Sequence, residues 1–132
     1  PIKGDLPVLM MGGSHDSVIA ASSIRYGIEK GSATEMLKKS FEQSLQDAEA
    51  TSHCVLVEGG NHFSIMHNPD HTMARGFLGS NEPHPGIFSG LISLVMAFME
   101  DALSSSNDQE SHVDRWIDEN STLLTKAFRS KS

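Results

Sequence analysis

Residues 55–63 read VLVEGGNHF, an aliphatic run that ends at a glycine pair and is followed at once by His62. Residues 8–16 read VLMMGGSHD, an apolar run that ends in the same way and leads to Asp16. Apolar runs without polar alternation are typical of strands covered on both faces, as in the parallel sheets of α/β proteins. The two stretches therefore predict two buried strands, one followed by an acid and the other by a base.

The segment between these stretches predicts a parallel crossover. A short, imperfect helix is expected over residues 19–30. Ser32 and Glu35 then have the spacing of a capping box, and apolar residues at helical spacing follow up to about Ala50. A strand–helix–strand unit brings both strand ends to one edge of the sheet, where open α/β sheets place their chemistry.

The rest of the chain is predicted to be helical around one long loop. Residues 66–86 are rich in glycine and proline and predict a loop, followed by a helix over 87–103 and a polar linker over 104–108. A final amphipathic helix is expected over 112–128, and its apolar positions are Val113, Trp116, Ile117, Leu124 and Phe128. The predicted organisation is a sheet-containing part, 1–103, and a linker with a C-terminal helix, 104–132.

Size and composition exclude several classes of protein. A chain of 132 residues can bury one core, and a net charge of -7 argues against nucleic acid as a partner. The longest apolar run, residues 87–99, is interrupted by serine and glycine and is too short to span a bilayer, so no membrane span is predicted. Cys54 is the one cysteine, which excludes an internal disulfide and predicts a small core residue.

The predicted elements do not make a complete sheet. Two parallel strands leave both outer edges unpaired, and the predicted helices provide more cover than two strands require. The chain also starts at Pro1 rather than at a methionine. We therefore expect the missing strands to come from elsewhere, with this chain as the C-terminal part of a larger protein.

The order of these motifs over residues 6–103 resembles the last third of an α/β-hydrolase. That family arranges its catalytic triad along the chain as nucleophile, acid, histidine. The resemblance implies a three-layer α/β sandwich in which Asp16 is the acid and His62 the general base. It implies a small-molecule carboxylic ester as substrate, the N-terminal remainder of the hydrolase domain as partner, and neither cofactor nor metal. Esterases of the dienelactone-hydrolase or platelet-activating-factor-acetylhydrolase type are the most similar.

The chain departs from the family in lacking a nucleophile. The Gly-x-Ser-x-Gly elbow is absent, and so is an oxyanion-hole loop of the His-Gly-Gly kind. Both are expected upstream of Pro1, so the chain alone is expected to be inactive. In the implied acyl-transfer mechanism His62 takes a proton from an absent serine or cysteine and returns it to the leaving group, while Asp16 holds the imidazole tautomer.

Other interpretations of the two site residues remain open. Asp16 has the sequence context of a solvated turn carboxylate, and His62 that of a strand-end residue capping carbonyl groups. A degenerate hydrolase that binds or regulates without turnover would carry the same residues.

Ser14, His15 and Asp16 spell a triad in sequence, but adjacent side chains point in different directions, so His15 is expected at the rim. Ser64 lacks a glycine-flanked elbow and is not expected to be the nucleophile.

The residues after His62 allow two further hypotheses. A metal site would draw on five side chains, His62, His67, Asp70, His71 and His84. Asn68-Pro69 interrupts any helix that would align His67 with His71, which favours a polar loop over a metal site. Phe63 and Met66 are candidates for the substrate pocket, with packing of the loop as the alternative.

Overall fold

A computed structural model describes residues 3–28, 31–45, 47–65, 85–104 and 110–130. The elements in chain order are β1 (Lys3–Gly4), β2 (Leu9–Gly13), α1 (Ser17–Ser23), the 3-10 helix η1 (Ile24–Tyr26), α2 (Ala33–Ser44), β3 (Asp47–Ala48), β4 (His53–Val57), α4 (Pro85–Leu103), α5 (His112–Glu119), the 3-10 helix η2 (Ser121–Leu123) and β5 (Leu124–Arg129). The fold is mixed α/β, as predicted.

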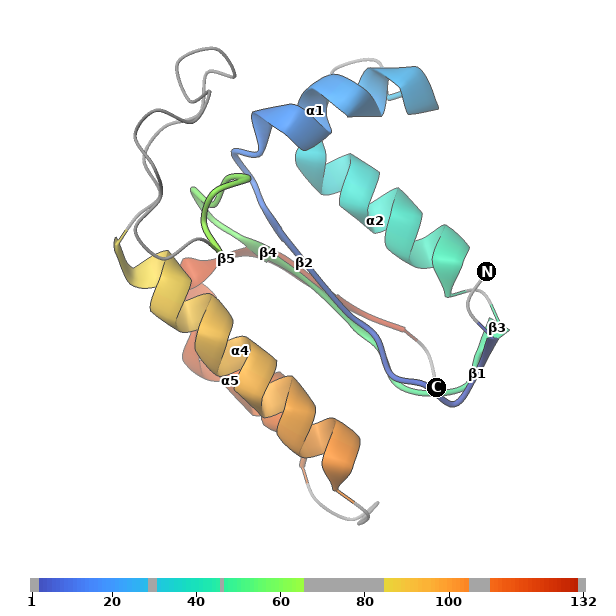
Figure 1. The fold of residues 1–132 in the computed structure, drawn as a ribbon, viewed down its shortest axis with the longest axis vertical. Helices are drawn as coiled ribbons and strands as arrows, with labels where there is room; N and C mark the ends of the chain where they lie inside the picture. Colours follow the sequence, from blue (N-terminus) through green and yellow to red (C-terminus); the bar gives the residue numbers. More distant parts are fainter. Residues whose placement is uncertain (1–2, 29–30, 46, 66–84, 105–109, 131–132) are drawn as a thin grey trace.

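A three-stranded sheet in the order β2-β4-β5 forms the centre of the molecule. β2 and β4 are parallel, as predicted, with Leu9 opposite His53 and Gly13 opposite Val57. Helices α1 and α2 lie on one side of the sheet, and α4 and α5 lie on the other (Figure 1). β1 and β3 form a separate parallel pair of two residues each.

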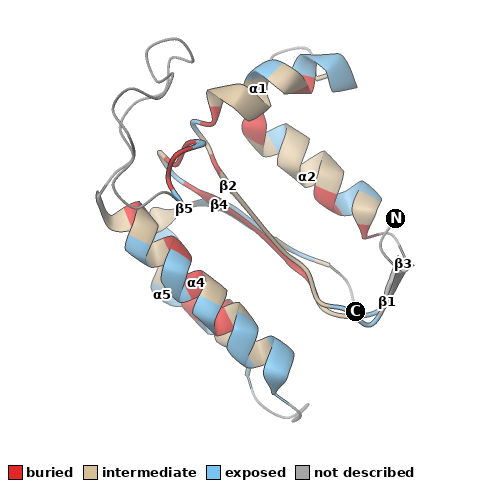
Figure 2. Ribbon diagram, viewed as in Figure 1, coloured by how far each residue is buried: buried red, intermediate tan, exposed pale blue. Residues whose placement is uncertain are grey.

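The central strand β4 is buried along its whole length, whereas most of β2 is half-buried (Figure 2). Successive side chains of a strand point to opposite faces. Cys54 and Leu56 accordingly belong to the cluster around Phe41 of α2, and Val55 belongs to the cluster around Leu94 of α4. Because neighbouring residues of β4 pack on opposite faces, its continuous apolar run reflects cover on both faces. Complete burial of each aliphatic side chain stabilises the fold by about 1.5–3 kcal/mol.

The prediction of one C-terminal helix over 112–128 is wrong. The helix ends at Glu119, and Leu124–Arg129 form β5, antiparallel to β4. A register shift at Leu56/Val57 places Phe128 opposite Cys54 but Leu124 opposite Val57. Phe128 therefore packs in the α2 cluster and Leu124 in the α4–α5 cluster. One strand that is missing from the sequence prediction thus comes from this chain itself.

Helix α2 is shorter than predicted. Ser32 caps α2 as expected, because its Oγ accepts a hydrogen bond from the Glu35 N–H at 3.2 Å. The helix ends at Ser44 instead of running to Ala50, with Leu45 buried at its C-cap and β3 following. The segment predicted as a helix over 19–30 forms α1 and η1 within residues 17–26.

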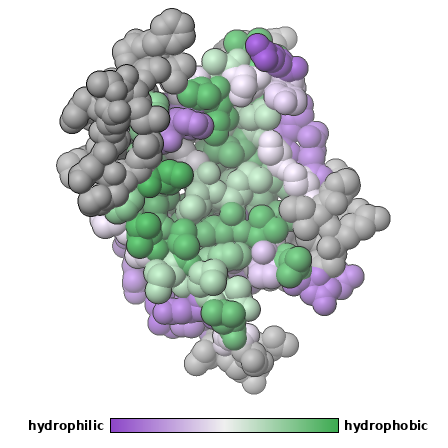
Figure 3. Space-filling model, in the orientation of Figure 1, coloured by the Kyte–Doolittle hydropathy of each residue, from purple (hydrophilic) through white to green (hydrophobic). Residues whose placement is uncertain are grey.

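Helix α4 is longer and more apolar than the sequence prediction assumed. Its residues Gly86–Leu103 are long and apolar enough to cross a membrane, by length and composition alone. Mostly buried core helices meet the same criterion, so length and composition alone do not establish a membrane span. In this structure 22% of the segment is buried, and Leu94 packs against the sheet. The opposite side exposes Ile92, Met96 and Met99. In the view of Figure 3, hydrophobic side chains gather over α4 and the adjoining edge of β2.

Candidate active site

The structure brings the two predicted site residues together. Asp16 follows β2 and His62 follows β4, at the carboxyl ends of adjacent parallel strands. The Nδ1 atom of His62 lies 3.2 Å from Oδ2 of Asp16. The parallel pairing accounts for this encounter between residues 46 positions apart, because parallel strands end at the same edge of a sheet.

The Asp16 carboxylate is fixed by helix α1. Its Oδ1 accepts hydrogen bonds from the N–H groups of Val18 at 3.1 Å and Ile19 at 3.0 Å, so Asp16 is the N-cap of the helix. The side chain is only 5% exposed. The interpretation of Asp16 as a solvated turn residue is therefore wrong, and its Oδ2 is directed to His62.

His62 is exposed on the side away from Asp16. Its side chain is 53% exposed, in contrast to the buried carboxylate. The ring of Phe63 contacts the imidazole edge-on, with centroids 5.9 Å apart and an interplanar angle of 89°. Because Nδ1 faces Asp16, Nε2 is the ring atom that remains for an incoming group. A histidine ordered in this way has the orientation of a general base.

Hydrogen bonds join the loops that carry the two residues. The Ser14 N–H donates to the Val57 carbonyl at 3.0 Å, and the His15 N–H donates to the Gly60 carbonyl at 2.9 Å. The Ser14 hydroxyl in turn accepts from the Gly59 N–H at 3.0 Å. A Cβ atom on Gly13 would overlap the backbone of Gly60. The glycine pairs thus permit the close approach that brings acid and base together.

A pocket of about 250 Å³ adjoins the pair. Asp16, Asn61, His62 and Ser64 contribute its polar side chains, and the apolar ones come from Met11, Ile19, Val57, Ile65, Ile87 and Leu91. Phe63, a predicted pocket candidate, is buried and does not line this pocket. The neighbouring Ile65, 65% exposed, lines it instead. Met66, the other predicted candidate, lies outside the described residues.

The other residues singled out in the sequence lie away from the His62–Asp16 contact or support it indirectly. His15 lies at the rim, with Nε2 3.9 Å from Glu58. Cys54 is a buried core residue, and burial raises the pKa of its thiol to about 11. The Ser64 hydroxyl accepts a hydrogen bond from the Asn61 N–H. The proposed metal ligands other than His62 lie outside the described residues, namely His67, Asp70, His71 and His84. Within the described ranges, no group of three potential ligands could hold a metal ion.

Sequence reasoning missed a second histidine–carboxylate pair at the other end of β4. His53 Nε2 lies 3.1 Å from Asp114 Oδ1, and Asp114 Oδ2 is 3.1 Å from Arg129 Nη1. The His53 side chain is 5% exposed, and that of Asp114 33%. The three residues lie on β4, α5 and β5, so the cluster joins the C-terminal elements to the centre of the sheet.

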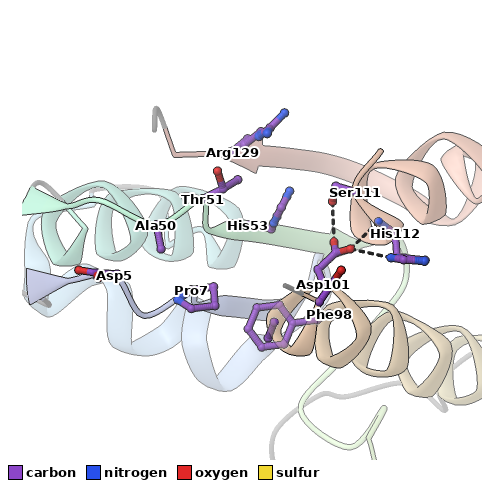
Figure 4. A pocket seen from close by; sticks show the side chains of 12 residues that line it. Asp5, Pro7, Ala50, Thr51, His53, Phe98, Asp101, Ser111, His112 and Arg129 are labelled. Atoms are coloured by element: carbon purple, nitrogen blue, oxygen red, sulfur yellow. Dashed lines mark hydrogen bonds and ion pairs between the residues drawn. The ribbon is translucent and has the colours of Figure 1, made fainter. Parts of the chain in front are cut away.

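A larger cavity of about 390 Å³ lies beside this second pair (Figure 4). Within it, Asp101 of α4 points toward Ser111 and His112 at the start of α5. Burial alone would raise the pKa of the Asp101 carboxyl, but hydrogen bonds from Ser111, Val113 and His112 lower it from 3.8 to about 2. His112 Nδ1 lies 2.8 Å from Asp101. These bonds connect α4 to α5 and account for the polar lining.

Comparisons of the chain with protein-family models, with curated proteins and with solved structures find no match. The function is therefore inferred from the geometry of the two loops.

Proposed function

We propose that this chain is the acid- and base-bearing part of an α/β-hydrolase that cleaves carboxylic esters, with a nucleophile supplied by an upstream segment. The observation that carries the proposal is the 3.2 Å contact between His62 Nδ1 and Asp16 Oδ2 at the carboxyl ends of adjacent parallel strands. The acid is buried and the base exposed to a pocket, which is the distribution that acyl transfer requires.

The two residues divide the proton transfer between them. With its Nδ1–H donated to Asp16, His62 presents an unprotonated Nε2 to the hydroxyl or thiol of the nucleophile. It accepts that proton as the nucleophile attacks the ester carbonyl and returns it to the departing alkoxide, which leaves the acyl group on the nucleophile. Water, deprotonated by His62, then attacks this acyl group, and His62 returns the proton to the nucleophile as the carboxylic acid leaves. Asp16 stabilises the imidazolium between these steps without becoming protonated. Its anchoring by the N–H groups of Val18 and Ile19 keeps Oδ2 in place throughout.

The free edge of β2 supports an upstream partner. β4 pairs on both sides, whereas within the described residues the outer edges of both β2 and β5 are unpaired in the three-stranded sheet. Sheet edges of this kind are normally covered or extended. The hydrophobic surface over α4 and the β2 edge (Figure 3) would be covered by further strands and helices of the same hydrolase domain.

The pocket beside His62 favours an uncharged ester group. Its side chains are mostly aliphatic, and Asp16 is the one carboxylate among them. A pocket of about 250 Å³ has room for a short acyl chain or an aromatic ring. No cofactor enters this chemistry. Among α/β-hydrolases we favour the dienelactone-hydrolase or platelet-activating-factor-acetylhydrolase type.

An activity-based label tests the proposal. A fluorophosphonate probe is applied to the chain alone and to the longest natural polypeptide that contains it. We expect labelling of the longer polypeptide only, lost in His62→Ala and retained in His15→Ala, which removes an exposed histidine of the neighbouring loop. Labelling of the chain itself would show that one of its own serines is the nucleophile. A longer polypeptide without any labelling or esterase activity would favour a non-catalytic binding module.

A further inference from the structure

The turn that carries His62 is closed by a serine hydroxyl. The Ser64 N–H donates to the Asn61 carbonyl at 3.0 Å, and the Asn61 N–H donates to the Ser64 Oγ at 2.8 Å. The carboxamide Oδ1 of Asn61 also accepts from the Phe63 N–H at 2.9 Å. Reciprocal bonds of this kind satisfy donors at both ends of one short segment, much as a capping box does. His62 is one of the two residues enclosed by this ring.

The ring is buried although the imidazole it carries is not. Asn61 is 6% and Ser64 4% exposed. Both residues line the pocket beside His62, yet the Ser64 oxygen is engaged with the turn backbone. Ser64 lacks the glycine-flanked elbow of a nucleophile, and its hydroxyl instead accepts the hydrogen bond that closes the turn.

We propose that Ser64 is a positioning residue that keeps the imidazole of His62 directed at Asp16. This inference rests on the proposed function, in which His62 is the general base. Among the described residues, the His62 ring contacts Asp16 and Phe63, and 53% of its side chain is exposed. Its direction is therefore set mainly by the backbone on either side, which the Asn61–Ser64 bonds hold.

The chemistry of position 64 calls for a small hydroxyl. Alanine at position 64 would remove the acceptor of the buried Asn61 N–H, and the loss of a hydrogen-bond acceptor in the protein interior lowers stability. Threonine retains the hydroxyl, and cysteine retains the size with a weaker acceptor. A purely space-filling role would rank these replacements by volume. A positioning role ranks them by hydrogen bonding, with threonine above cysteine and cysteine above alanine.

Nitrogen NMR of the imidazole tests the proposal in the 132-residue chain. The ¹⁵N shifts of Nδ1 and Nε2 at pH 8 report which nitrogen carries the proton. A charge-assisted hydrogen bond to Asp16 corresponds to a preference of about tenfold or more for the Nδ1–H form. We expect this preference in the wild type, its loss in Ser64→Ala and its recovery in Ser64→Thr. Ser89→Ala, which removes an exposed hydroxyl from α4, is the matched control and keeps the preference.

Two outcomes would overturn the inference. One is a folded Ser64→Ala variant with the wild-type tautomer preference. The other, should that variant not fold, is a Ser64→Cys variant whose preference equals that of the wild type. The readout needs no nucleophile, so it is separate from the proposed function. If the longer polypeptide proves inactive while Ser64→Ala loses the preference, the proposed function fails and the positioning role stands. In an active longer polypeptide, we expect Ser64→Ala to lower kcat about tenfold with little change in KM.

Discussion

A histidine–carboxylate pair lies at each end of β4. The distances between the paired atoms are nearly equal, but the more exposed member is the histidine in one pair and the carboxylate in the other. At one end His62 lies 3.2 Å from Asp16, with the acid buried and the base half-exposed. At the other His53 lies 3.1 Å from Asp114, with the base buried and the acid shared with Arg129. The distance alone does not distinguish them. What differs is the partner that faces solvent, and only the first pair offers a histidine nitrogen to an incoming group.

The same substitution in both pairs is the strongest way to break this comparison. Asp16→Asn would leave the carboxamide near His62 but remove the charge that stabilises the imidazolium. In the longer polypeptide we expect ester hydrolysis to fall about ten thousandfold. Asp114→Asn is the matched control and should leave the rate within about twofold of wild type, because Asp114 contacts His53 at the opposite end of β4. An Asp16→Asn enzyme of near wild-type rate would remove Asp16 from the mechanism.

The approach of the loops can be tested at Gly13. A Cβ atom at this position would overlap the backbone of Gly60 and force the loops apart. We expect Gly13→Ala to lower the free energy of unfolding by about 3 kcal/mol and to separate His62 from Asp16. Gly59→Ala is the control, because its Cβ would meet nothing within 4 Å. Its positive φ of 69° should cost only about 1 kcal/mol. Urea unfolding of the two variants measures the difference, and equal losses would argue against a tight contact.

Acid titration tests a third carboxylate, Asp101, whose hydrogen bonds join α4 to α5. The pKa of Asp101 is lower in the folded protein than in the unfolded chain. Its stabilisation is therefore present above about pH 4 and is lost as the pH falls through about 2. We expect this carboxylate to account for about 2 kcal/mol of the acid-induced loss of stability. Urea unfolding between pH 6 and pH 2 should show a shallower loss in Asp101→Asn than in wild type, and an unchanged loss in the exposed control Asp118→Asn.

Asp114→Asn is expected to change the free energy of unfolding by the smallest amount. The amide can still accept a hydrogen bond from His53, but the ion pair with Arg129 is lost. Because Asp114 is one-third exposed, we expect a loss of about 1 kcal/mol in the free energy of unfolding. Thermal unfolding beside the exposed-residue control Glu119→Gln measures it. A loss above about 3 kcal/mol would mean that the second pair behaves as a fully buried one.

The sequence predicts the first pair well because its parts are local. An apolar run, a glycine pair and a polar residue can be recognised without knowledge of the rest of the fold. Parallel pairing then brings Asp16 and His62 to one edge. The Ser32 cap and the burial of Cys54 follow from equally local rules.

The second pair and β5 depend on contacts that no local pattern reveals. His53 and Asp114 meet only because α5 returns to the sheet. Leu124 and Phe128 have helical spacing, but the register shift at Leu56/Val57 turns them to opposite faces of a strand. The early end of α2 is a further case, since Leu45 continues the apolar pattern beyond the last helical residue.

The position of β5 has a consequence during synthesis. On the ribosome, β2 and β4 emerge long before residues 124–129, so the sheet can begin to form with one side of its central strand open. The nascent chain would then hold Asp16 near His62 while His53 still lacks Asp114. Until β5 arrives, β4 offers a row of unpaired backbone groups to any neighbouring chain. Loss of residues 124–129 should thus be harmful through aggregation of the newly made protein.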